Sequence, residues 1–180
     1  MSDDAIAAAV RAAKRKAIFA PGPTSHDVAC GRAEVERLLP HRDPFLFVDS
    51  VRQVDLEQEA LLARRTVRAD DPIFAGHFPG HPIYPGVLLL ETMGQAGICL
   101  VHFLRRRTLE VGSDVRPADV RALKIHTALF LDAVGPGAEL DVMARLVSDE
   151  GMTAVCLGQL WRGPVIAAVA VMEVYFVEAP

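Results

Sequence analysis

The chain has 180 residues, of which 51% are hydrophobic and 23% charged, with a formal net charge of -4 at pH 7. This length supports one ordinary domain with its own core, and the apolar fraction excludes a disordered chain. The charge excludes a general polyanion binder, although a local basic patch is compatible with it. Three cysteines (Cys30, Cys99 and Cys156) lie far apart, which indicates neither a disulfide framework nor a zinc knuckle and favours a reducing compartment.

Residues 1–20 are predicted to form a loosely attached helical extension, followed over 21–27 by a linker that contains Pro-Gly-Pro. A secretory signal is not indicated, because Asp3 and Asp4 come first and the basic residues follow the short apolar run. These basic residues, Lys14–Lys16, lie near the C-terminal end of the predicted helix, where cations suit the helix dipole.

Residues 28–180 are expected to form a single domain. A short helix is predicted over Ala33–Leu39, ended by Pro40, and a long apolar helix over Gly86–Leu104. Segments rich in β-branched and apolar residues, bounded by turn signals, predict strands over 45–54, 59–68, 120–130, 139–147, 153–162 and 165–177.

The long helix is apolar nearly all round, so it must be covered on most sides. The expected architecture is therefore α+β, with an antiparallel sheet of five to six strands curled round the helix. Exposed sheet edges and an uncovered helix flank favour dimerisation. The helix carries Glu91, Gln95 and His102, and an ionised glutamate is costly within a bilayer, so a core helix is expected rather than a membrane span.

The segment before this helix is predicted to be a stiff extended loop, because Pro79, Pro82 and Pro85 recur at every third residue. Such a loop can hold His77 in one place. Pro85 suits the start of a helix, and the amide of Gly86 then points outwards without an internal partner. That amide is suited to developing negative charge on an oxygen.

Glu91 and Gln95 are four residues apart and share one helix face with apolar neighbours. Partial desolvation of Glu91 favours its protonated, acid-competent form. With His77, these groups predict a proton shuttle beside a polarised carbonyl, although a lone loop histidine is also compatible with a structural role. His77 and His81 have the spacing of a metal pair only on a helix, which the prolines preclude, so no metal is predicted.

Two motifs resemble those of FabZ-type 3-hydroxyacyl-acyl-carrier-protein dehydratases. The first is LPHRDPFLFVD over residues 39–49, and the second runs over 76–96, where GHFPG precedes a helix that carries Glu91 and Gln95. The resemblance implies a hotdog fold, in which a curved antiparallel sheet wraps a long central helix. It also implies a homodimer with shared active sites, often a trimer of dimers, and a substrate carried on a phosphopantetheine thiol with no metal, nucleotide or flavin.

The resemblance further implies that His77 removes the C2 proton of a (3R)-3-hydroxyacyl thioester and that Glu91 protonates the departing hydroxyl. The Gly86 amide would bind the thioester oxygen. The Ile83 carbonyl would orient the His77 ring, and Gln95 would position Glu91 or a water.

Two further sets of residues are assigned from the resemblance. An acyl tunnel is expected to involve Phe78, Tyr84 and Val87, which are equally compatible with ordinary core packing. Family members tend to alternate basic and apolar residues in the segment that corresponds to 127–131. In this chain the segment is TALFL, so the usual basic docking residues are absent from it. Five basic residues are expected to supply substitute cations for docking an acidic carrier protein: Arg105, Arg106, Arg107, Arg121 and Lys124. They are also compatible with a solvated charged turn that has no partner.

The expected function is dehydration of 3-hydroxyacyl chains on acyl carrier protein in fatty-acid or related acyl-chain biosynthesis. The expected location is the cytoplasm, without nucleic-acid binding. Two alternatives remain open: a hotdog thioesterase, and a non-catalytic partner subunit of a hetero-oligomeric dehydratase.

Overall fold

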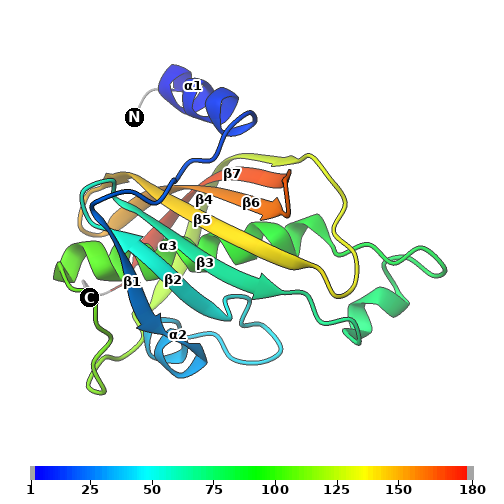
Figure 1. Cartoon of the computed structure of the whole chain (residues 1–180), viewed down its shortest axis with the longest axis horizontal. Helices are drawn as coiled ribbons and strands as arrows, with labels where there is room; N and C mark the ends of the chain where they lie inside the picture. Colours follow the sequence, from blue (N-terminus) through cyan, green and yellow to red (C-terminus); the bar gives the residue numbers. More distant parts are fainter. Residues whose placement is uncertain (1–2, 178–180) are drawn as a thin grey trace.

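The computed structural model describes residues 3–177; residues 1–2 of the predicted extension and 178–180 of the predicted domain lie outside the described residues. Figure 1 shows one curved sheet wrapped round a long helix. The elements are α1 (Asp3–Ala13), β1 (Ser25–Cys30), α2 (Arg32–Leu38), β2 (Ser50–Asp55), β3 (Ala60–Thr66), a 3-10 helix η1 (Pro72–Ala75), α3 (Gly86–Arg106), β4 (Val120–Phe130), β5 (Glu139–Asp149), β6 (Thr153–Arg162) and β7 (Val165–Phe176).

The sheet has seven strands in the order β1-β2-β3-β5-β6-β7-β4, and every neighbouring pair is antiparallel. The expectation of five to six strands is therefore wrong. The missed strand is β1, which begins at Ser25 inside the segment expected to be a linker and pairs with β2. Its sequence, Ser-His-Asp-Val-Ala-Cys, has too few apolar residues to give a strand signal.

The predicted strand over 45–54 is displaced, because the chain becomes a strand only at Ser50. The short helix, the long helix and the last four strands lie where they were predicted, within two residues at each end.

Helix α3 lies along one face of the sheet and packs against β5, β6 and β7. Its side chains form the centre of the core and include Met93, Ala96, Cys99, Leu100 and Phe103. A Cβ at Gly158 of β6 would lie 2.6 Å from the Cβ of Met93, so this close helix–strand approach requires glycine. Although α3 is long and apolar enough to cross a membrane, 67% of its most apolar window is buried inside the protein, as expected of a core helix.

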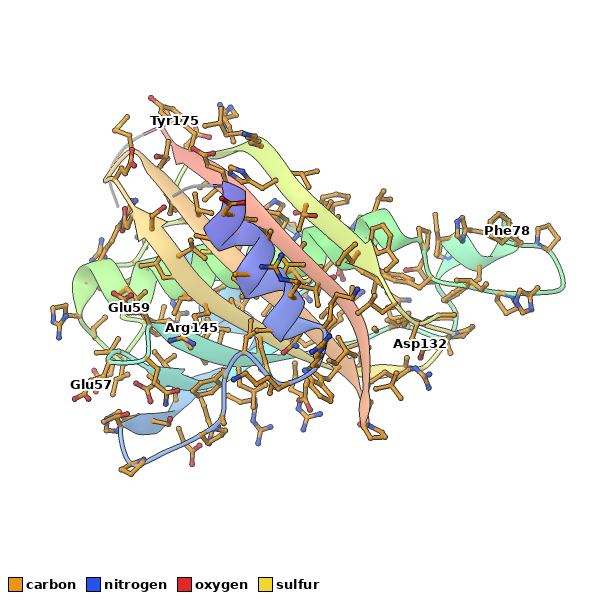
Figure 2. The ribbon with its side chains drawn as sticks, turned by 90° about the horizontal axis from the view of Figure 1, so that it is seen from above. Glu57, Glu59, Phe78, Asp132, Arg145 and Tyr175 are labelled. Carbon is orange, nitrogen blue, oxygen red and sulfur yellow. The ribbon has the colours of Figure 1, made fainter. Side chains whose placement is uncertain are left out.

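Helix α1 crosses the other face of the sheet, over β7 (Figure 2). Apolar side chains of α1 pack on β6 and β7 in a second buried cluster of Ile6, Val10, Ala13, Leu157, Val169 and Val171. Buried Gln159 of β6 also binds the extension: its amide nitrogen donates to the carbonyls of Ala13 and Lys16, and its oxygen accepts from the Ile18 amide. The expectation of a loosely attached extension is therefore wrong.

Candidate active site

The loop between η1 and α3 fixes the ring of His77. Its Nδ1 lies 2.8 Å from the carbonyl oxygen of Ile83, and the Ile83 amide donates back to the His77 carbonyl at 3.0 Å. A carbonyl oxygen can only accept, so we assign the proton to Nδ1, which leaves the lone pair of Nε2 free to act as a base. The ring of Phe78 stacks on the imidazole with centroids 4.0 Å apart.

Gly86 is the first residue of α3, so its amide has no acceptor within the helix. A Cβ at this position would lie 3.0 Å from ring atoms of Phe130, so a larger residue would need that ring to shift. His77 and Gly86 line one cavity of about 320 Å³, together with Ile83, Tyr84 and Phe130. His77 and the first residue of α3 therefore border the same space.

Glu91 lies one and a half turns further along α3 and is held by Gln95. The Gln95 amide nitrogen donates to Glu91 Oε1 at 2.9 Å and to the Phe45 carbonyl at 2.9 Å. Its oxygen accepts from the Phe47 amide at 2.7 Å. Gln95 is fully buried, so this network anchors the carboxyl group to the backbone that precedes β2.

His41 is the residue of this site that sequence reasoning missed. It lies in the first motif, and its Nε2 is 3.4 Å from Glu91 Oε1. Burial lowers the pKa of His41, and nearby Arg42 acts in the same direction against the opposing effect of the Glu91 carboxylate. The net effect favours the neutral imidazole. The available signal was that His41 and Glu91 lie in the two family motifs.

Glu91 faces a different cavity from His77. This cavity has a volume of about 190 Å³ and is lined by His41, Val87, Glu91, Lys124 and Glu173, among others. No hydrogen bond or ion pair links His77 to Glu91 among residues 3–177. A single protomer thus presents the imidazole and the carboxyl group in separate spaces.

Two of the three predicted tunnel residues line these cavities, one in each. Tyr84 is 2% exposed, packs against Phe74 and lines the cavity of His77. Val87 lines the cavity of Glu91 and is 66% exposed, and Phe78 is 50% exposed beside His77. Figure 2 shows Phe78 on the loop that projects beyond the end of the sheet.

The predicted docking cations do not form one patch near Glu91. Arg105 pairs with Asp149 and lies over the Phe176 ring, and Arg121 pairs with Asp119. Arg106 and Arg107 are exposed at the far end of α3, about 22 Å along the helix axis from Glu91. Among the five predicted docking residues, Lys124 alone lines the Glu91 cavity.

Comparison with known proteins identifies the family. The FabA-like domain family matches residues 39–168, which begin with the first motif and end within β7. The chain belongs to this family. Its relatives include the 3-hydroxyacyl-acyl-carrier-protein dehydratase FabZ of Sulfurimonas denitrificans, 34% identical over 145 residues, which cover 81% of this chain and 95% of the relative. The FabZ of Campylobacter concisus is 36% identical over 146 residues, with 81% and 96% coverage.

Solved structures agree with the hotdog fold of the FabA-like family. The dehydratase heterocomplex ApeI:P from Xenorhabdus doucetiae matches with a TM-score of 0.60 at 18% identity, covering 79% of this chain and 90% of that chain. An uncharacterized protein from Pyrococcus horikoshii matches with a TM-score of 0.52 at 13% identity, covering 79% and 92%. At these identities the likeness shows the fold alone.

Proposed function

We propose that this chain dehydrates (3R)-3-hydroxyacyl thioesters of acyl carrier protein to trans-2-enoyl thioesters, in fatty-acid or related acyl-chain biosynthesis. One observation carries the proposal: His77, whose Nδ1 is engaged by Ile83, lines the same cavity as Gly86 at the tip of α3. This pairs a base for a C–H proton with a donor for the oxygen that becomes negative. The curated FabZ relatives, named for this activity, support it over most of the chain.

The reaction follows from three groups. Nε2 of His77 takes the proton from C2, and the electron pair moves into the thioester carbonyl, whose oxygen accepts a hydrogen bond from the Gly86 amide. The pair then returns to form the C2–C3 double bond while the C3–O bond breaks. Protonated Glu91 gives its proton to the leaving hydroxyl, which departs as water, and a proton passes from His77 to Glu91 to reset the pair.

We also propose that the working unit is a homodimer in which His77 of one protomer meets Glu91 of its partner. The separate cavities within one protomer support this arrangement. So does β4, an edge strand whose Leu123 and Ile125 are more than half exposed, with Ile125 lining the Glu91 cavity. An unpaired apolar edge is a surface that association covers. Assembly of such dimers into a trimer is part of the proposal.

The proposed elimination is acid–base chemistry on a thioester, so we propose no resident cofactor; the phosphopantetheine thiol arrives with the substrate. We propose a cytoplasmic location. In its support, Cys30, Cys99 and Cys156 are buried free thiols, which suits a reducing compartment.

The decisive experiment incubates the enzyme with carrier proteins loaded with 3-hydroxyacyl chains of graded length and follows loss of water by mass spectrometry. We expect enoyl product from the wild type, and a rate lower by about 100- to 10,000-fold for His77→Ala and for Glu91→Gln. Wild-type inactivity at every chain length contradicts the proposal. So does release of free acid and thiol without enoyl product, which is the outcome expected of a thioesterase.

A further inference from the structure

Besides the cavities of His77 and Glu91, the structure has a groove between the N-terminal extension and the edge strand β4. It has a volume of about 530 Å³, and its walls carry Arg11 and Lys14 from the extension and Lys124 and His126 from β4. Apolar residues of α1 and β4, including Val10, complete the lining. Helix α1 lies outside the matched family region, 39–168. Of the two walls of the groove, the one formed by β4 lies within that region.

The groove has an excess of unpaired positive charge. Arg11, Lys14 and Lys124 are exposed, and none of them forms an ion pair within residues 3–177. His126 of the groove wall lies 3.2 Å from the carboxylate of Glu173, so that carboxylate is engaged by the histidine. These cations therefore differ from Arg105 and Arg121, whose charges are paired with aspartates.

The position of α1 is fixed, so its cations are presented at a defined place. The helix is attached by its buried apolar face and by the hydrogen bonds from Gln159 to the backbone that follows it. Leu129 of β4 packs against this apolar cluster and lies in the TALFL segment, which lacks basic residues. The extension thus places positive charge over a strand that has none at these positions.

The groove and the Glu91 cavity adjoin at the edge strand β4, because Lys124 lines both. An anionic partner seated in the groove would therefore contact the same stretch of β4 that lines the Glu91 cavity.

We infer that the groove between α1 and β4 is the docking surface for the acidic face of the acyl carrier protein, with Arg11 and Lys14 of the extension as its main contacts. This inference rests on the proposed function, which supplies an acidic carrier as the partner. Charge complementarity and the shared lining residue Lys124, which joins the groove to the Glu91 cavity, argue for this occupant.

The test compares two double variants that change charge equally within the extension. Arg11→Glu/Lys14→Glu reverses the charge in the groove, whereas Arg15→Glu/Lys16→Glu reverses two exposed cations outside it. Binding of holo acyl carrier protein is measured by calorimetry at low and high salt. Turnover is measured with one acyl chain as the carrier, coenzyme A and N-acetylcysteamine thioesters.

We expect the groove variant to weaken carrier binding and to raise KM for the carrier thioester by about tenfold or more, with kcat unchanged. Turnover of the N-acetylcysteamine thioester should stay unchanged, and the control variant should behave like the wild type. Added salt should weaken wild-type binding more than binding by the groove variant.

Equal effects of the two double variants, or no wild-type binding of the carrier, would overturn the inference. An equal loss with the coenzyme A thioester would overturn it as well, because the groove would then bind phosphate groups rather than the carrier surface. Failure of the proposed function gives a different result: carrier binding that depends on Arg11 and Lys14, without dehydration of any thioester.

Discussion

At the scale of single residues, Gln95 connects the fold to the proposed chemistry. Its amide satisfies the backbone of Phe45 and Phe47 and at the same time holds Glu91 Oε1. The carboxyl group therefore has one preferred orientation before any substrate arrives. A positioning role of this kind lowers the entropy that the reaction must otherwise lose.

Replacement of Gln95 by leucine should lower kcat with little change in KM, because Glu91 loses the group that orients it. It should also cost about 1–3 kcal/mol in free energy of unfolding, because the buried Phe47 amide loses its partner. Kinetics with an N-acetylcysteamine thioester and chemical denaturation measure the two effects.

The matched control for Gln95→Leu is Gln159→Leu. Gln159 is also a fully buried glutamine, but its bonds go to the N-terminal extension. It should lose stability while keeping the kcat of the folded enzyme. Equal loss of kcat in both variants would show that Gln95 acts only through the stability of the fold.

At the scale of elements, the sequence predicts α3 and the four strands after it because their apolar patterns are long and turn signals bound them. It predicts α1 but not its attachment. The strand beneath α1, β7, is apolar on both faces, so alternation does not show which face is covered. The contact of His41 with Glu91 is likewise hidden, because fifty residues separate them and no local pattern links them.

The C-terminal half of α3 contains a buried titratable group. His102 is 7% exposed, and its Nε2 has no hydrogen-bond partner among the described residues. Burial, with a smaller contribution from Arg106, lowers the pKa of His102 to about 4. An unfolded histidine takes up its proton near pH 6.5. Between these values the unfolded state binds more protons, so stability should fall as the pH drops from about 6.5 to about 4.

Replacement of His102 by phenylalanine should flatten this part of the stability profile. The free energy of unfolding, measured by denaturant titration at several pH values in this window, should then fall less on acidification than in the wild type. His26 on β1 is exposed, so His26→Phe should retain the wild-type slope. An unchanged slope in His102→Phe would show that other groups cause the acid sensitivity.

At the scale of the whole molecule, one protomer contains every proposed catalytic group but does not bring Glu91 together with His77 and Gly86. His77 lies on the loop between η1 and α3, whereas Glu91 lies on α3 in a cavity that β4 also lines. The order of the motifs in the sequence predicts which residues take part. Convergence across a dimer cannot be read from one chain, because no residue spacing encodes a contact between two copies.

Mixing two inactive variants tests the shared site directly. His77→Ala and Glu91→Gln should each be inactive as homodimers. In a mixed dimer, each site takes His77 from one protomer and Glu91 from the other. One site then carries both substitutions, while the other combines an intact His77 with an intact Glu91. Random reassortment makes half of the dimers mixed, so denaturation and joint refolding should restore about a quarter of wild-type activity. Refolding each variant alone is the control. If both groups acted within one protomer, joint refolding would restore nothing, because every protomer in the mixture would lack one of them.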